Sequence, residues 1–197
     1  MIKFENVSKM YGGKLIFDSL NLTLEPGSRT AIMGPSGCGK TTALMILAGL
    51  ETQDGGDITG VENKRVSMVF QDDRLCENLS LYANVKIVCS QNKRKSEIAD
   101  AASELGLGDS INKAASKLSG GMRRRAAILR AMLADFDILL LDEPFNGLDP
   151  DAKRQTAQFI VSRLDNRTVL LVTHNPDDAE LLGCERIMFE EIANINK

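Results

Sequence analysis

The N-terminal part of the chain alternates hydrophobic and polar residues, as a half-buried β-strand does. The alternation over residues 2–7 predicts a first strand, and residues 20–24 repeat it before a turn at Pro26 and Gly27. Loops and hairpin turns are then predicted around four glycines, which are Gly49, Gly55, Gly56 and Gly60.

Four later segments read as short, largely apolar strands without alternation, which is typical of strands buried on both faces of a sheet. They are residues 29–33, 66–70, 136–141 and 168–173. Helical segments lie between or beside them, at residues 40 to about 50, 120–134 and 150–164. This alternation of helices and continuous apolar strands predicts a parallel sheet covered on both faces.

The character of the sequence changes between about residues 72 and 117, where strand signals vanish and helix formers dominate. Residues 95–105 predict an exposed helix that ends at Gly106. We therefore expect one domain over residues 1–197, with a core of about 1–71 and 118–197 and an inserted helical subdomain. The polar run 91–95 predicts a solvated loop or helix start, and Arg123, Arg124 and Arg125 predict a mostly solvated helix face, with one arginine tied to neighbouring acids.

Composition narrows the class of protein. The 197 residues include 24 Lys+Arg and 27 Asp+Glu, for a net charge of −3, which argues against a dedicated nucleic-acid binder. The longest apolar run, residues 43–48, is far shorter than the roughly 20 residues that cross a bilayer. The first residues contain no long apolar stretch, so no signal peptide is expected.

The four cysteines, Cys38, Cys76, Cys89 and Cys184, form no CxxC pair and no zinc-like spacing with the single histidine. They are expected to be reduced thiols of a cytoplasmic protein. Cys38 lies in a Gly-rich turn beside Lys40, a setting that favours its thiolate, so we expect slow alkylation that nucleotide blocks.

The segment after the strand 29–33 fits the pattern GxxxxGK[ST] at every fixed position. Its residues are Gly34, Pro35, Ser36, Gly37, Cys38, Gly39, Lys40 and Thr41, with Thr42 next. Glycines let backbone N–H groups converge on an anion, and the following helix points its positive end at the same place. Lys40 would contact the β- and γ-phosphates of a nucleoside triphosphate, and the Thr41 hydroxyl would coordinate Mg²⁺. One alternative is a Gly-rich turn that binds no ligand. A dinucleotide site is a second alternative, but it would need the pattern GxGxxG, which this loop lacks. The motif alone does not separate kinases, GTPases and ATPases.

Two acids follow the apolar residues 138–141. Because parallel sheets expose ligands at the carboxyl ends of their strands, Asp142 is expected near the phosphate loop, where it would hold Mg²⁺ through its water shell. Glu143 would polarise the attacking water. Acids that merely end a strand are the alternative interpretation.

A second Ser/Gly-rich helix start follows the helical segment. Leu118, Ser119, Gly120, Gly121 and Met122 open the helix 120–134, and such a start is a second anion site. This segment resembles the signature of ATP-binding cassette (ABC) ATPases, usually LSGGQ. Met122 replaces the usual glutamine but leaves Ser119 and the N–H groups of Gly120 and Gly121, so function is expected to survive.

Further motifs agree with this resemblance in order and spacing, over residues 2–189. Gln71 resembles the Q-loop glutamine, a Mg²⁺ ligand and γ-phosphate sensor, and His174 resembles the switch histidine that contacts the γ-phosphate. Tyr11 lies where the family stacks an aromatic on adenine, although an exposed turn tyrosine is an equal alternative. Gly147, Leu148 and Asp149 resemble the D-loop. Asn175 departs from the acid that is common after the histidine.

The resemblance implies a P-loop NTPase core with a mixed, largely parallel sheet, an N-terminal antiparallel β region and an inserted α-helical subdomain. It implies a head-to-tail pair of cassettes, each ATP lying between one P-loop and the Ser119-Gly120-Gly121 turn of the other copy. Lys40, Glu143 and His174 would carry catalysis with Mg²⁺.

The implied partners are a second, identical cassette and integral membrane transporter subunits, with a solute-binding protein in the complex and no nucleic acid. The location is the cytoplasmic side of the membrane, where residues 71–82 and the helical subdomain would receive the membrane subunits. Residues 69–75 are similar to cassettes of nitrate, sulfonate and taurine importers. A cassette for export or envelope remodelling shares every motif. A soluble ABC ATPase acting on DNA or ribosomes fits less well, because the chain has neither coiled-coil insertions nor fused cassettes. The signature turn argues against a P-loop kinase.

Overall fold

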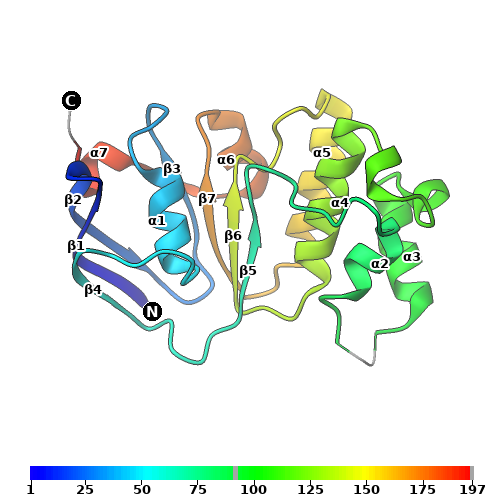
Figure 1. Cartoon of the computed structure of the whole chain (residues 1–197), viewed down its shortest axis with the longest axis horizontal. Helices are drawn as coiled ribbons and strands as arrows, with labels where there is room; N and C mark the ends of the chain where they lie inside the picture. The colour runs from blue at the N-terminus through cyan, green and yellow to red at the C-terminus, as the bar shows by residue number, and fades with distance from the viewer. Residues whose placement is uncertain (91–92, 196–197) are drawn as a thin grey trace.

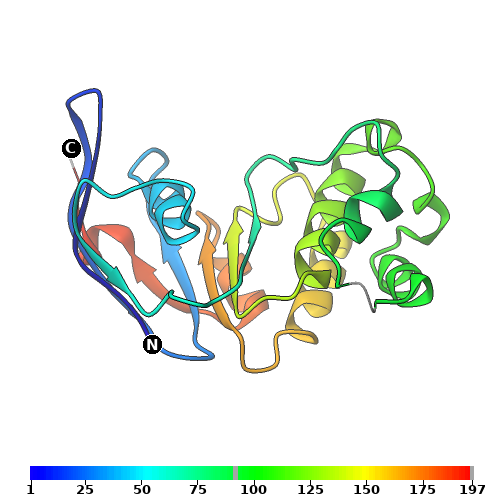
Figure 2. The same cartoon turned by 60° about the horizontal axis from the view of Figure 1, so that its bottom comes forward.

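The computed structural model of the chain describes residues 1–90 and 93–195 (Figure 1). Gln91 and Asn92, which belong to the predicted solvated run, lie outside the described residues. Three parts follow one another along the long axis: an antiparallel sheet at one end, a parallel sheet with its helices in the middle, and small helices at the other end, as Figures 1 and 2 agree.

The antiparallel sheet has the strand order β4-β1-β2-β9. Its strands are β1 (Ile2–Tyr11), β2 (Lys14–Leu24), β4 (Gly55–Thr59) and β9 (Asn194–Ile195). Strands β1 and β2 are both longer than predicted, and in β1 the reason is an inward-facing charged residue. Lys9 is buried and its Nζ donates to the carbonyl oxygen of Thr52 at 2.7 Å, so a polar residue occupies a buried position and hides the alternation.

The loop predicted at Gly55 and Gly56 is instead strand β4, so that prediction was wrong. Gly56 lies so close to β1 that an added Cβ would be 2.3 Å from the carbonyl oxygen of Asn6. The glycine therefore serves a close approach of two backbones rather than a hairpin turn.

The second sheet has the order β5-β6-β7-β3-β8, and all of its pairs are parallel. Its strands are β3 (Arg29–Met33), β5 (Val66–Val69), β6 (Ile138–Asp142), β7 (Thr168–Val172) and β8 (Glu185–Met188). The prediction of a parallel sheet is confirmed.

Helices cover this sheet on both faces. They are α1 (Lys40–Leu47), α4 (Gly120–Leu133), α5 (Pro150–Val161), α6 (Pro176–Leu182) and α7 (Phe189–Ile192). The end of the molecule beyond α4 holds α2 (Leu81–Lys86), α3 (Lys95–Glu104) and the 3-10 turns η1 (Gly108–Ser110) and η2 (Ala115–Lys117). Helix α1 ends at Leu47, three residues before the predicted helix end at Leu50. Two residues after Leu47, Gly49 adopts a left-handed φ of 69°, which is typical of a helix C-terminus.

Alternate residues of the central strands face two separate hydrophobic clusters. Leu139 and Leu141 of β6 pack in the cluster that contains α4 and its neighbours, whereas Leu140 packs with α1 and the antiparallel sheet. Burial on both faces explains the unbroken apolar run that identified these strands. Among the described residues, no helix is both long and apolar enough to cross a membrane.

Candidate functional site

The candidate site lies at the edge of the parallel sheet where the carboxyl ends of β3, β5, β6 and β7 meet (Figure 1). The phosphate-loop motif follows β3, Gln71 follows β5, Glu143 follows β6 and His174 follows β7. Parallel pairing brings these four segments to one edge although more than 130 residues separate the first from the last.

The phosphate loop joins β3 to the first turn of α1. Gly39, the N-cap residue of α1, has a φ of 107°, and an added Cβ would lie 2.7 Å from Cδ1 of Phe17. Only glycine fits this turn, which points the N-terminus of α1 into the loop. Lys40 is buried, and its Nζ donates to the carbonyl oxygens of Gly34 at 2.8 Å and Pro35 at 2.7 Å. The ammonium group therefore lies inside the curve of the loop.

Thr41 and Asp142 bring two hard oxygen atoms together. The Thr41 hydroxyl donates to Oδ1 of Asp142 at 3.2 Å, and the Asp142 residue is only 1% exposed. Burial raises the pKa of the Asp142 carboxyl above its usual range, while the Thr41 hydrogen bond and the charges of Arg124 and Lys40 act in the opposite direction.

This donor set fits a magnesium ion that is shared with a nucleotide. Among the described residues, no group of three or more His, Cys, Asp or Glu side chains has the arrangement of a metal site. One carboxylate and one hydroxyl suit Mg²⁺, which takes most of its remaining ligands from water and phosphate rather than from a protein cage.

Glu143 and His174 form a contacting pair. Nδ1 of His174 lies 2.8 Å from Oε1 of Glu143, and the Glu143 side chain is 13% exposed against 63% for His174. The Thr173 hydroxyl lies 3.3 Å from Oε2 of Glu143 and donates to Asp178 at 2.7 Å. Glu143 has a left-handed φ of 48°, which is uncommon for a residue with a side chain and marks the point where the chain leaves β6.

Arg124 is the buried member of the arginine triplet, at 4% exposure, and its contact with Asp73 agrees with the predicted tie of one arginine to a neighbouring acid; the depth of its burial was not predicted. Its guanidinium donates to backbone carbonyls on both the segment after β5 and the segment after β6, and it lies 3.5 Å from Oδ1 of Asp73. Burial lowers the pKa of Arg124, and the charge of Asp73 opposes that change. The missed signal is helical spacing, because Arg124 shares the buried face of α4 with Ala127, Ile128 and Ala131.

The segment after β5 is attached to the site through its backbone. Nη1 of Arg124 donates to the carbonyl oxygen of Gln71 at 3.2 Å, while the Gln71 residue itself is exposed. Its side chain is therefore available at the same sheet edge as Asp142 and Glu143.

The second anion-binding helix start is separate from the phosphate loop. Ser119 caps α4 by accepting from the N–H of Met122 at 3.3 Å, and an added Cβ on Gly121 would be 3.6 Å from the carbonyl oxygen of Gly147. Figures 1 and 2 show α1 and α4 on opposite sides of strands β5 and β6. The Ser119-Gly120-Gly121 turn therefore adjoins the D-loop-like segment rather than Lys40.

Tyr11 lies beside the first turn of α1. The residue is 44% exposed, and Nζ of Lys9 lies 4.8 Å from the centre of its ring. Partial burial and the charge of Glu51 raise the pKa of Tyr11, and the Thr42 hydroxyl partly opposes this through a hydrogen bond. The half-exposed ring thus lies near Thr42, the residue that directly follows the phosphate-loop motif.

Asp149 and Asn175 are helix caps. Asp149 accepts from the N–H groups of Asp151 at 3.1 Å and Ala152 at 2.9 Å at the start of α5. Asn175 accepts from the N–H of Asp177 at 3.0 Å at the start of α6, so asparagine supplies a cap at the position where an acid was expected.

A phosphate loop, a buried acid that ends a parallel strand, and a contacting Glu–His pair at one sheet edge define a P-loop nucleotide-binding ATPase. The family model described as "ABC transporter" matches residues 17–146. The chain belongs to the ABC transporter family, of which it is an ATP-binding, ATP-hydrolysing cassette. The resemblance inferred from the motifs is confirmed.

Curated relatives cover most of the chain. It is 35% identical to the thiamine import ATP-binding protein ThiQ of Aliivibrio fischeri, over 93% of this chain and 84% of ThiQ. It is 36% identical to the aliphatic sulfonates import ATP-binding protein SsuB of Delftia acidovorans, over 95% of this chain and 78% of SsuB.

A solved structure has the same fold. The dimeric structure of MJ0796, described as a bacterial ABC transporter cassette, matches with a TM-score of 0.84 at 26% identity, over 96% of this chain and 95% of that one. A second structure of MJ0796, in a post-hydrolysis state bound to ADP and Pi, matches with the same TM-score at 27% identity, over 95% of this chain and 94% of that one.

Proposed function

We propose that this cassette hydrolyses ATP to drive the import of a small solute through partner membrane subunits. The observation that carries the proposal is the set of Lys40, Asp142, Glu143 and His174 at one sheet edge, in a chain that aligns along nearly its whole length with import ATP-binding proteins. The residues 69–75 that are similar to small-anion importers agree with the sulfonate relative.

The nucleotide is proposed to lie along the phosphate loop and the start of α1. Tyr11 stacks on the adenine, and Lys40 contacts the β- and γ-phosphates. Backbone N–H groups of the loop cover the remaining phosphate oxygens. The residues assigned to nucleotide binding are Tyr11, Gly34, Pro35, Ser36, Gly37, Cys38, Gly39, Lys40, Thr41, Thr42, Gln71, Asp142 and, from the second copy, Ser119, Gly120 and Gly121.

Thr41, Asp142 and Gln71 are proposed to hold Mg²⁺, Asp142 through the metal's water shell. When bound, Mg²⁺ neutralises charge on the β- and γ-phosphates. The hydrogen bond between Thr41 and Asp142 supports this assignment, because it places both oxygen atoms next to each other without the help of a bound ligand.

Glu143 is proposed to orient the attacking water and accept its proton, and His174 to contact the γ-phosphate. The hydrogen bond between Nδ1 of His174 and Glu143 fixes the ring, so that Nε2 faces away from the carboxylate. Lys40 stabilises the charge that develops on the transferred phosphoryl group.

A second copy of the chain is proposed to complete each site. The phosphate loop and the Ser119-Gly120-Gly121 turn lie on opposite sides of β5 and β6, so one copy offers two half-sites that face the same way. A head-to-tail pair places the turn of one copy against the loop of the other, and the dimeric MJ0796 structures support such a pair. Hydrolysis and phosphate loss remove the bridge between two positive helix ends and open the dimer.

The membrane subunits are proposed to dock beside residues 71–82 and the helical subdomain of about residues 72–117. A groove of about 360 Å³ next to this segment is lined by apolar residues that include Leu50, Phe70 and Val88. Ile87 is 64% exposed and Leu79 is 39% exposed on the same part of the chain. The cassette would thus be peripheral, on the cytoplasmic side of the membrane, in a complex with a solute-binding protein outside and without nucleic acid.

Two measurements test this function. The Glu143→Gln protein with Mg·ATP should elute as a dimer, with light scattering as the readout, and should return to the monomer when ATP is removed. Affinity purification of the wild-type chain from detergent-solubilised membranes of its source should recover integral membrane transport subunits. Recovery with ribosomes or DNA and no membrane subunit would overturn the transport function.

A further inference from the structure

We propose that Arg124 is a positioning residue, whose guanidinium fixes the backbone of Glu143 and joins it to the backbone of the Gln71 segment. The inference rests on the proposed function because it assigns to Glu143 the activation of water. It adds a residue outside the motifs, located on the helix that the Ser119-Gly120-Gly121 turn begins.

The five N–H groups of Arg124 are matched by five backbone carbonyl oxygens. Nε donates to Pro144 at 2.9 Å, and Nη2 donates to Asp142 at 2.8 Å and Glu143 at 2.7 Å. Nη1 donates to Phe70 at 2.5 Å and Gln71 at 3.2 Å. The guanidinium has one donor on Nε and two on each terminal nitrogen, so this set uses its full donor capacity.

The carbonyls on the Glu143 side require a bend in the chain. In an extended strand, successive carbonyls point in opposite directions, yet those of Asp142 and Glu143 both reach one nitrogen of Arg124. The left-handed φ of 48° at Glu143 is what turns them to the same side. The same bend sets the direction of the Glu143 carboxylate toward His174, so the guanidinium and the carboxylate are linked through one residue.

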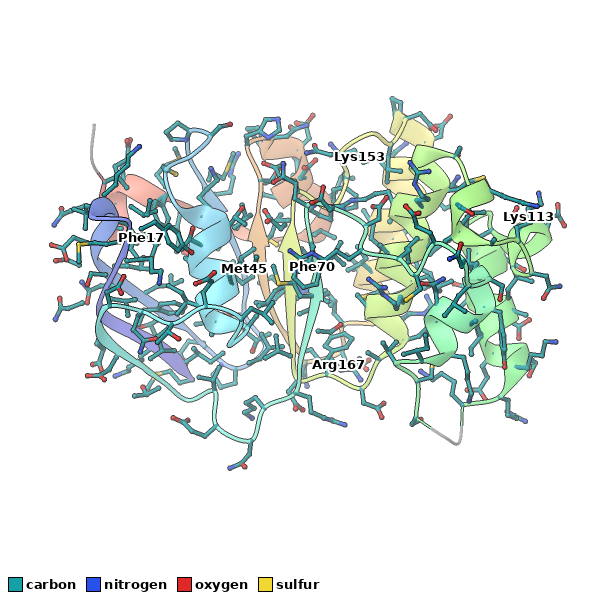
Figure 3. All side chains as sticks on the ribbon, viewed as in Figure 1. Phe17, Met45, Phe70, Lys113, Lys153 and Arg167 are labelled. Atoms are coloured by element: carbon teal, nitrogen blue, oxygen red, sulfur yellow. The ribbon has the colours of Figure 1, made fainter. Side chains whose placement is uncertain are left out.

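The other side of Arg124 holds the segment that follows β5, where Figure 3 labels Phe70. Besides the two carbonyls, Oδ1 of Asp73 lies 3.5 Å from Nη1 and supplies a countercharge. A planar, rigid guanidinium can hold two backbone segments at a fixed separation, whereas the point charge of a lysine cannot. A displacement of the Gln71 segment therefore reaches the backbone of Glu143 through a single side chain.

Arg130 provides a matched control on the same helix. It donates to the carbonyls of Arg74 at 2.7 Å and Asp73 at 3.1 Å, and burial lowers its pKa as it does for Arg124. Arg130 thus holds the segment that follows β5, but none of its hydrogen bonds among the described residues reaches residues 142–144.

The test compares Arg124→Gln and Arg124→Lys with Arg130→Gln in the full chain, by steady-state Mg·ATPase activity and by binding of a fluorescent ATP analogue. We expect both Arg124 variants to lose at least tenfold in kcat while the dissociation constant of the analogue stays within threefold. Arg130→Gln should keep kcat within threefold of wild type. Thermal unfolding of each variant identifies an assay temperature at which all variants are folded. If Arg124→Gln does not fold, the comparison uses Arg124→Lys, which retains the buried positive charge.

Two further readouts separate positioning from general stability. Single-turnover hydrolysis by Arg124→Gln/Glu143→Gln should be no slower than by Glu143→Gln alone, because the arginine acts through that carboxylate. Hydrogen exchange should accelerate at residues 70–74 and 143–146 in Arg124→Gln, but only at the first segment in Arg130→Gln.

Wild-type kcat in either Arg124 variant would overturn the inference, as would an additive loss in the double variant. These outcomes differ from failure of the proposed function, which would appear as a wild-type chain without Mg·ATPase activity, or as a Glu143→Gln variant with full activity.

Discussion

Nδ1 of His174 lies 2.8 Å from Oε1 of Glu143, although the two residues are 31 positions apart in the chain. The contact exists because β6 and β7 are adjacent parallel strands that end at the same edge of the sheet. It places one mostly buried carboxylate and one exposed imidazole next to each other, beside the buried Asp142.

The first prediction concerns Glu143→Gln. Glutamine keeps the size of the side chain but cannot accept a proton, so we expect ATP turnover to fall by about 10²–10⁴-fold with ATP binding retained. Steady-state ATPase assays and analogue binding measure the two quantities. Glu185→Gln, at an exposed position of β8, should keep wild-type turnover. Near-normal ATPase activity of Glu143→Gln would remove Glu143 from the catalytic role.

Asp142→Asn should separate stability from activity. Because burial raises the pKa of Asp142, the charged carboxylate costs the folded state free energy at neutral pH. We expect the substitution to raise the melting temperature of the nucleotide-free protein near neutral pH, by about 2–4 °C for each kcal/mol gained, and to abolish Mg²⁺-dependent turnover.

The pH dependence of that gain follows from the sign of the shift. As the pH falls through the raised pKa of Asp142, the wild-type carboxyl also becomes neutral, and the advantage of asparagine should shrink. Asp137→Asn is the opposite control, because a hydrogen bond from Arg65 lowers the pKa of Asp137, and this substitution should not raise the melting temperature. A stabilising effect of Asp142→Asn that grows toward acidic pH would contradict the assignment.

Cys38 should report nucleotide binding without hydrolysis. The Cys38 residue is 7% exposed in the phosphate loop, with Nζ of Lys40 3.7 Å from its sulfur. We expect slow alkylation by N-ethylmaleimide, followed by mass spectrometry, to be blocked by Mg·ATP. Exposed Cys76 should react in both conditions, and Cys184 in neither, since burial raises its pKa to about 12. Equal labelling of Cys38 with and without nucleotide would argue against binding at this loop.

Lys153 near the start of α5 (Figure 3) forms an ion pair with the buried Asp178 of α6. Lys153→Met leaves the carboxylate in a dry site without its countercharge, so the free energy of unfolding should fall by about 3 kcal/mol. Urea unfolding measures this loss. Arg154→Met removes the neighbouring, exposed pair with Asp151 and should cost less than about 1 kcal/mol. Equal losses in the two variants would contradict the buried character of the Lys153 pair.

Much of the fold could be predicted from local patterns. Strand β3 runs over the predicted residues 29–33, and α3 differs from its prediction by one residue, because each has its own periodicity. Strand β4 was missed because Gly55 and Gly56 have no strand propensity, and their conformation is imposed by pairing with β1. The inward-facing Lys9 likewise hid the continuation of β1, since its buried charge is stabilised by residues more than 40 positions away.

For the site, each motif could be predicted because its residues are consecutive. The pairing of Glu143 with His174 follows only once the order of the parallel strands is known. A contact between one arginine of the triplet and an acid was predicted, but the burial of Arg124 was not. Three successive arginines suggest a solvated surface, whereas the carbonyls that surround Arg124 come from segments about 20 and 50 residues away.

The opposite placement of the phosphate loop and the Ser119-Gly120-Gly121 turn has a genetic consequence for a head-to-tail pair. A protein with Lys40→Ala and a protein with Ser119→Arg are each inactive alone, since every composite site in the homodimers carries one lesion. In a mixed dimer both lesions fall in the same composite site, and the other is wholly wild type. Co-expression of the two alleles should therefore restore part of the activity, which a single allele carrying both substitutions could never do.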